Sequence, residues 1–322
     1  MHDILQRKVK DIRLDDINLA SIIKKMEDAG GFSAKNLARA VSILEEMKND
    51  KECKKFVSFP AAIIATGLRG LIAQMIELDY FDVIITTCGT LDHDLAKAYG
   101  GEYYHGSFEM DDTELHKAGI NRLGNILIPN ESYGIILENN IQPVLKELIK
   151  TKNEWSGREL IQEFGKRLKD ENSILYQASK KNIPVYVPGI TDGAFGTNLL
   201  WFSQSNNFKL NILQDEKELS DIAFTVKKTG ALIVGGGISK HHTIWWNHPK
   251  GGLNYAVYIT TAAEYDGSLS GARTKEAISW GKIKEDAKYV TVDGEATVIL
   301  PIIFATLFEK EIMKEIYDKT RF

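Results

Sequence analysis

The segment Glu276–Ile283, with the sequence EAISWGKI, places Trp280, Gly281 and Lys282 in succession after the first turns of an amphipathic pattern. A lysine is a nucleophile at neutral pH when burial lowers its pKa, and it then forms imines with carbonyl compounds or exchanges amines with an existing imine. Trp280 would supply an apolar wall, and Gly281 would let the chain turn so that the amine points into a cleft. The alternative is that Lys282 only opens an exposed turn, KIKEDAK, and spacing alone favours that alternative.

A second concentration of polar and aromatic side chains, GGGISKHHTIWWNHP at 235–249, contains histidines, tryptophans and a lysine. Adjacent histidines point to different sides, so we expect no metal site. A histidine that hydrogen-bonds a substrate amine, or one that caps a helix, fits the pattern better. The faces of Trp245 and Trp246 attract alkylammonium groups, but core or interface packing is the preferred interpretation.

The composition limits the classes of function. Lys+Arg 40 against Asp+Glu 44 gives a net charge of −4, which argues against nucleic-acid and membrane partners. The charged start and the lack of an apolar run of ~18 residues predict a cytoplasmic protein. Cys53 and Cys88 form neither a disulfide framework nor a zinc spacing, which favours a reducing compartment. Cys88 is interpreted as a small residue in a tight turn rather than as a nucleophile.

The pattern of apolar residues predicts the helices and strands that position these residues. Residues 1–55 look helical, with Ser33 as an N-cap, and helix patterns follow at 62–78 and 215–230, the latter closing on Gly230. Between helices, runs of apolar residues without alternation are typical of strands buried on both faces. The pattern predicts a doubly wound, mainly parallel α/β sheet (Rossmann-like), with residues 1–55 as an N-terminal helical extension and 56–322 as one catalytic domain. The expected strands are 81–87, 183–189, 230–237, 254–261 and 288–292.

Small or polar residues follow the expected strands, in TTCG (86–89), TDG (191–193), GGG (235–237) and TTA (260–262). In an open parallel sheet, ligands bind at the carboxyl ends of strands, where glycine lets the backbone approach a phosphate and helix N-termini favour anions. A nucleotide site is therefore a hypothesis, although the chain has no G-x-G-x-x-G fingerprint and no P-loop.

Several long motifs together resemble one family. NYAVYITTAAEYDGSLSGARTKEAISWGKI, GGGISKHH, TDGAFG, ITTCGTLDHDL and NRLGNILIPNESY are similar to segments of deoxyhypusine synthases of the archaeal branch. The resemblance implies that NAD oxidises spermidine, that the butylamine fragment passes as an imine to an active-site lysine and then to a lysine of a translation factor, and that the retained hydride reduces the final imine. It also implies a homotetramer in which paired subunits share active sites.

The resemblance assigns roles residue by residue. Lys282 matches the nucleophile, with Trp280 lining its apolar tunnel, and His241 matches a histidine that acts near the substrate amine. Glu276 matches a carboxylate of the amine site. A free lysine is roughly a thousandth deprotonated or less at pH 7, so burial of the nucleophile would be part of the mechanism. The further substrate-binding candidates are Asp92, His93, Gly267 and Ser268.

The resemblance also implies an NAD site. Asp192 would bind ribose hydroxyls, a use of a carboxylate at a strand end that favours NAD over NADP, and its alternative role is a helix cap. Glu295 and Ala296 fall at an expected helix N-terminus. The matching cofactor positions are Thr66, Thr87, Cys88, Gly89, Asp192, Gly236, Thr261, Ala262, Glu295 and Ala296.

This chain departs from eukaryotic members on the amine side. Thr197 and Leu269 stand where those members carry aspartates that bind the amine, and Asp92-His93 replaces a Glu-Glu pair. The donor, rather than the class of reaction, is left open by these changes. Two alternatives remain: a homospermidine-synthase-like aminobutyl transferase that acts on a small diamine, and a non-catalytic NAD-binding regulatory protein.

Overall fold

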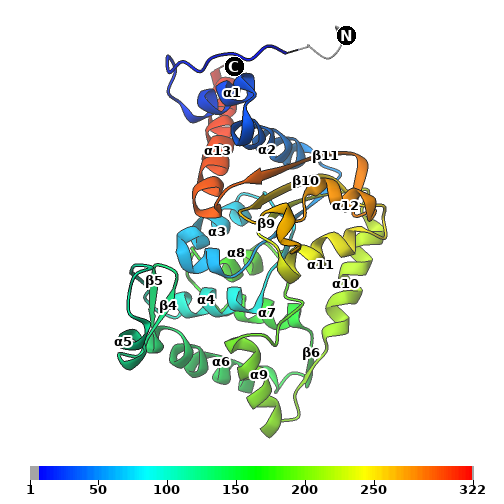
Figure 1. The fold of residues 1–322 in the computed structure, drawn as a ribbon. Helices are drawn as coiled ribbons and strands as arrows, with labels where there is room; N and C mark the ends of the chain where they lie inside the picture. The colour runs from blue at the N-terminus through cyan, green and yellow to red at the C-terminus, as the bar shows by residue number, and fades with distance from the viewer. Residues whose placement is uncertain (1–6, 321–322) are drawn as a thin grey trace.

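A six-stranded sheet forms the centre of the computed structural model, which describes residues 7–320 (Figure 1). The strand order is β11-β10-β9-β1-β2-β7, and every neighbouring pair is parallel. The predicted mainly parallel sheet is therefore confirmed. Its strands are β1 (Cys53–Ser58), β2 (Val83–Ile85), β7 (Val185–Tyr186), β9 (Lys228–Val234), β10 (Leu253–Thr260) and β11 (Ile283–Asp293).

Helices surround this sheet, and two smaller sheets lie outside it. The helices are α1 (Leu19–Ala29), α2 (Phe32–Asn49), α3 (Arg69–Glu77), α4 (Cys88–Ala98), α5 (Asp112–Lys117), α6 (Gly134–Leu148), α7 (Gly157–Arg167), α8 (Ile174–Lys180), α9 (Ala194–Ser205), α10 (Ile212–Thr225), α11 (Gly237–Asn247), α12 (Thr274–Ser279) and α13 (Ala296–Thr320). Short helical turns are η2 (Ile64–Leu68), η3 (Asn130–Ser132) and η4 (Glu264–Asp266). The smaller sheets pair β3 (Tyr104–His105), β5 (Ile126–Pro129) and β4 (Ile120–Leu123) antiparallel, and β6 (Glu154–Trp155) with β8 (Lys209–Leu210) parallel.

The two faces of the sheet pack against different helices, as a doubly wound fold requires. Because successive strand residues point to opposite faces, Leu232 joins the core under α2, α3 and α13, whereas Ala231 and Ile233 join the core under α10, α11 and α12. Burial on both faces explains why these strands show apolar runs without alternation.

The predicted N-terminal helices are confirmed as α1 and α2, but the last residues of the predicted helical segment form a strand. Residues 1–6 lie outside the described residues. The strand β1 begins at Cys53, inside the segment expected to be helical, and it lies in the middle of the sheet. The expected boundary at 55/56 falls within this strand, and the division into an N-terminal extension and one catalytic domain stays a prediction.

Three other local predictions need correction. The helix pattern at 62–78 is interrupted at Gly67, whose φ of +100° lies inside η2, directly before α3. The helix expected to close on Gly230 ends at Thr225, and Gly230 lies inside β9, where a Cβ would come within 2.6 Å of Met47 Sδ. The cap of α2 is Gly31 rather than Ser33.

Charged residues interrupt the pairing of the edge strand β11 with β10. Its register with β10 shifts between Leu253, which pairs with Ile283, and Tyr255, which pairs with Lys288. Residues 284–287 therefore leave the ladder, so this part of the KIKEDAK stretch is a bulge in a strand rather than a turn. In residues 7–320, no helix has both the length and the apolar character needed to span a bilayer.

Candidate active site

The carboxyl ends of β9, β10 and β11 surround a cavity of about 430 Å³, here called the strand-end cavity. Parallel strands share one carboxyl edge, which is where open α/β sheets bind ligands. Gly235 lines it with a φ of +69°, a conformation that glycine adopts without strain. Five of the expected site residues also line it: Thr261, Ala262, Ser268, Glu295 and Ala296.

Glu295 lies directly before α13 and caps that helix. Its carboxylate oxygens accept hydrogen bonds from the main-chain N–H of Thr297, both at 3.0 Å. The cap places the positive end of the α13 dipole beside the strand-end cavity, where it favours an anionic ligand.

The remaining cofactor candidates follow other strands at the same edge but do not line this cavity. Gly236 ends the connection from β9 to α11, and a Cβ there would lie 2.1 Å from the Ser270 hydroxyl oxygen. Only glycine therefore lets the 268–272 segment pack so closely. The others follow β1, β2 and β7, and they are Thr66, Thr87, Cys88, Gly89 and Asp192.

Cys88 is a structural thiol at the start of α4. Its Sγ donates to the main-chain oxygen of Ile190 at 3.1 Å, and burial raises its pKa to about 12. A thiol with so high a pKa is almost wholly protonated at neutral pH, which agrees with the interpretation against a cysteine nucleophile.

A smaller cavity of about 170 Å³, here called the amine cavity, lies between α11 and α12. Glu276, Trp280 and Lys282 line it together. The Lys282 Nζ lies 5.3 Å from the ring centre of Trp280 and 6.0 Å from that of Trp245. Both rings are within the distance at which an indole face attracts a cation.

His241 belongs to the same cluster. Its ring stacks on Trp245, with centres 5.8 Å apart. Burial, and then the charge of Lys282, lower the pKa of His241, so the ring is neutral at physiological pH. Trp280 is 64% exposed, so the apolar wall around Lys282 is incomplete within a single chain.

Lys240 is the fully buried lysine of this region, and the sequence reasoning missed it. Its ammonium group donates to the main-chain oxygens of Leu269 and Ala272, each at 2.7 Å, and lies 4.2 Å from the ring centre of Tyr258. Burial lowers its pKa to about 8. The motif GGGISKHH contains this lysine, but no local signal distinguishes it from an exposed helix lysine.

Tyr258 offers a polar group that the described residues leave unpaired. Its side chain is 1% exposed and lines the amine cavity, and its hydroxyl has no hydrogen-bond partner in the described part of the chain. A buried hydroxyl without a partner is costly, so a ligand in the cavity that bonds to it would be favoured.

The 268–272 segment separates the two cavities. Ser268 and Ser270 line the strand-end cavity, whereas Leu269 and Ala272 line the amine cavity. Gly267 precedes the segment with a φ of +71°. A cofactor and an amine bound in the two cavities would lie on either side of this short stretch of chain.

Asp92 and His93 lie away from Lys282. The Asp92 carboxylate is 1% exposed and accepts hydrogen bonds from the main-chain N–H groups of Ala194 and Phe195 and from the Tyr133 hydroxyl, at 3.0, 2.7 and 2.9 Å. It thereby caps α9, and its oxygens already have partners.

His93 and Thr197 line a cavity of about 680 Å³ between the β4–β5 hairpin, α6 and α9, here called the hairpin cavity. The His93 Nδ1 lies 2.7 Å from the Tyr103 hydroxyl, and burial lowers its pKa to about 4. Figure 1 shows α12 and the hairpin on opposite sides of the molecule. One chain therefore does not bring these residues to Lys282.

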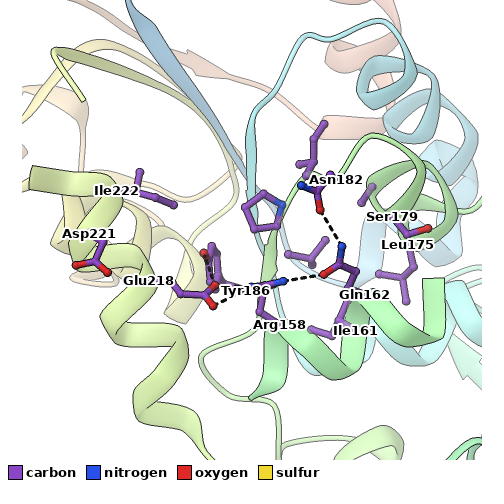
Figure 2. Close-up of a pocket in the computed structure, with 14 residues that line it drawn as sticks. Arg158, Ile161, Gln162, Leu175, Ser179, Asn182, Tyr186, Glu218, Asp221 and Ile222 are labelled. Carbon is purple, nitrogen blue, oxygen red and sulfur yellow. Dashed lines mark hydrogen bonds and ion pairs between the residues drawn. The ribbon is translucent and has the colours of Figure 1, made fainter. Parts of the chain in front are cut away.

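A fourth cavity, of about 310 Å³, contains none of the expected site residues (Figure 2). Four of its polar side chains pair with one another, whereas the Asp221 carboxylate makes no side-chain hydrogen bond or ion pair within the described residues. Arg158 forms a two-pronged ion pair with Glu218 at 2.8 and 2.9 Å, and Gln162 donates to Asn182 at 2.8 Å. The Arg158–Glu218 pair ties α7 to α10.

Comparison with known proteins identifies the family. The family model described as deoxyhypusine synthase matches residues 21–307. The chain belongs to the deoxyhypusine synthase family. The match includes the strand ends, the 268–272 segment and the Lys282 region.

Curated relatives named probable deoxyhypusine synthase share about half of their residues with the chain. That of Picrophilus torridus is 54% identical over 306 residues, covering 94% of this chain and 98% of the relative. That of Sulfurisphaera tokodaii is 52% identical over 306 residues, covering 95% and 98%. A crystal structure of a putative deoxyhypusine synthase from Entamoeba histolytica has the same fold, with a TM-score of 0.64 at 21% identity over 92% of this chain and 96% of that one.

Membership in the deoxyhypusine synthase family makes the chain an aminobutyl-transferring enzyme. The comparisons do not favour the homospermidine-synthase-like or the non-catalytic alternative.

Proposed function

We propose that the chain transfers the aminobutyl group of spermidine, or of a related polyamine, to a lysine of a translation factor in an NAD-dependent reaction, with Lys282 as the covalent carrier. The observation that carries the proposal is the position of the Lys282 amino group. It lies 5.3 and 6.0 Å from two indole ring centres, in a cavity that Glu276 also lines, across the 268–272 segment from the strand-end cavity. The acceptor works in the cytoplasm, so the proposal places the protein there.

The strand-end cavity fits a dinucleotide. It has a volume in the range of cofactor sites, a glycine in the left-handed conformation and a helix N-terminus beside it. Thr261, Ala262, Glu295 and Ala296 would hold the cofactor there, with Asp192 on a ribose. When bound, NAD accepts a hydride from the donor amine and later returns it.

The residues of the amine cavity would do the rest of the chemistry. Glu276 would neutralise an ammonium group of the donor, and the neutral His241 ring can accept a proton from the reacting amine. Lys282 Nζ would attack the donor's imine carbon and release the diamine portion, forming its own imine. The amine of the acceptor lysine would then displace Lys282 in the same way.

We also propose that a second copy of the chain completes the site, within a homotetramer. The wall around Lys282 is open at Trp280, and the expected amine ligand His93 on α4 lines a different cavity of the same chain. A partner that presents its hairpin cavity to Lys282 would bring the two sets together and complete the burial that the nucleophile requires.

The test is to incubate the protein with NAD, spermidine labelled in its aminobutyl part and the acceptor protein, and then to locate the label. Label on one lysine of the acceptor is expected. Label on a free diamine instead would favour the homospermidine-synthase-like reaction, and no transfer at all would contradict the proposal.

A further inference from the structure

Helix α11 contains two histidine–tryptophan pairs, and the two pairs contact different neighbours. In a helix, residues four positions apart share a face, whereas adjacent residues are turned by about 100°. The His241 ring stacks on Trp245, with centres 5.8 Å apart, and the Trp245 ring centre lies 6.0 Å from Lys282 Nζ. The rings of His242 and Trp246 form a second pair, edge to face, with centres 6.3 Å apart. The second pair has no role in the proposed chemistry.

The neighbour of the second pair is Glu216 on α10. The Trp246 indole N–H donates to one carboxylate oxygen of Glu216 at 2.8 Å, and His242 Nε2 lies 3.5 Å from the other oxygen. Trp246 also packs against the apolar core on this side of the sheet. Burial lowers the pKa of His242 to about 4, so its ring is neutral at physiological pH. Glu216 therefore contacts both members of this pair.

Helix α10 is itself attached to α7, so Glu216 projects from a fixed element. Glu218 forms the two-pronged ion pair with Arg158 of α7, at 2.8 and 2.9 Å (Figure 2). The buried Asp215 accepts hydrogen bonds from the main-chain N–H of Arg158, at 3.1 Å to each carboxylate oxygen. Asp215 and Glu218 thus join α10 to α7, and Glu216 joins α10 to α11.

The orientation of α11 determines where the His241 ring lies relative to Lys282. Lys240 attaches α11 to the 268–272 segment, and Glu216 attaches it to α10. The face that carries His241 lies between these two attachments, because adjacent residues of a helix are turned by about 100°. A helix held on two faces resists rotation about its axis, so each attachment helps to keep the His241 ring near Lys282.

We propose that Glu216 is a positioning residue of the transfer reaction, which holds α11 in the orientation that presents His241 and Trp245 to Lys282. The inference rests on the proposed function for the roles of His241 and Lys282. Glu216 does not line the amine cavity within the described residues, so it acts through α11 rather than on the substrate. Trp246 thereby gains a role as the attachment point of α11.

Kinetics of four variants test the proposal. Glu216→Ala removes both contacts and should lower kcat by about tenfold, with the KM for NAD unchanged, because the reacting groups lose their alignment. Glu216→Gln keeps an oxygen that accepts from Trp246 and should recover most of the loss. Trp246→Phe removes the donor and should reproduce the loss, and combining it with Glu216→Ala should slow the enzyme no further. Asp221→Ala, on the same helix, is the matched control and should keep the parent rate.

The titration of the His241 ring is a readout that a general loss of stability would not move. Burial, and then the charge of Lys282, hold the pKa of this ring below its ordinary value. In Glu216→Ala, NMR titration of the ring, assigned with His241→Gln, should show a pKa moved up toward about 6.5. Glu216→Gln should stay near the parent. An unmoved titration in Glu216→Ala, or an unchanged kcat, would overturn the proposal.

The titration needs no turnover, so it separates this inference from the proposed function. If the parent chain transfers no label while the His241 titration depends on Glu216, the attachment of α11 stands and the reaction assignment falls. If the parent transfers label and Glu216→Ala is equally fast with an unmoved titration, only the role of Glu216 falls.

Discussion

The ammonium group of Lys240 donates a 2.7 Å hydrogen bond to the main-chain oxygen of Leu269, so α11 holds the segment that divides the strand-end cavity from the amine cavity. Lys240→Met would leave two buried carbonyl oxygens unpaired, at a cost of about 1–3 kcal/mol each. We expect KM to rise for both NAD and the donor, with the protein still folded. Lys240→Arg should recover part of the loss. A rise in only one KM would show that the segment does not serve both cavities.

Lys282 is predicted to be indispensable for transfer. Lys282→Ala removes the nucleophile, and Lys282→Arg leaves a group that stays charged and cannot exchange imines. Both variants should lose transfer to the acceptor and retain NAD binding. Borohydride trapping of the parent enzyme should attach the aminobutyl fragment to Lys282, and label on Lys240 instead would reverse the assignment.

The cofactor and amine sites should separate in titrations. Asp192→Ala and Glu295→Ala are each expected to weaken NAD binding by about 1–3 kcal/mol, roughly 5- to 150-fold, because each removes a polar contact. His241→Ala should lower turnover while the affinity for NAD stays nearly unchanged. The opposite pattern would mean that the two cavities have been assigned the wrong way round.

Donor preference follows from Thr197 and Leu269. With two carboxylates fewer than eukaryotic members, the site depends more on Glu276, so Glu276→Gln should lose more than about tenfold in kcat/KM, roughly 1.4 kcal/mol. Spermidine should be used, and agmatine should be tolerated better than by eukaryotic relatives. Steady-state rates with both donors decide this. Inert agmatine together with a smaller loss for Glu276→Gln would contradict it.

Stability should fall in mild acid because of His93. Burial, and then the charge of Lys97, lower its pKa to about 4 from an ordinary value of 6.5, so between these pH values the unfolded chain binds more protons than the folded chain. The free energy of unfolding therefore decreases as the pH falls from about 6.5 to 4, by about 3 kcal/mol at most from this residue.

Chemical denaturation of His93→Gln over this pH range should show a flatter dependence than the parent chain. His242, whose pKa burial also lowers to about 4, should behave similarly. An unaltered slope in His93→Gln would show that this ring is protonated in the folded state.

The parallel sheet could be predicted because strands buried on both faces consist of continuous apolar runs, and such runs are visible in the sequence. β1 was missed because Lys54 and Lys55 dilute its apolar character, and its central place depends on pairing with β9, far along the chain. Small residues after strands indicated a ligand-binding edge, and the strand-end cavity lies at that edge, whereas the individual cofactor positions stay a prediction. The burial of Lys240 could not be predicted, since it depends on the main-chain oxygen of Leu269, 29 residues away. The separation of Asp92 and His93 from Lys282 likewise requires the three-dimensional fold.

The bulge at residues 284–287 has a consequence for solubility. A flat edge strand with a free ladder invites pairing with another chain, and the charged bulge interrupts the regular strand near the start of β11. Lys284, Glu285 and Asp286 thereby act as gatekeepers against aggregation at the edge next to the Lys282 region. Straightening this strand to stiffen the sheet would create an exposed edge that can pair with other chains. Such a variant would form insoluble material during expression.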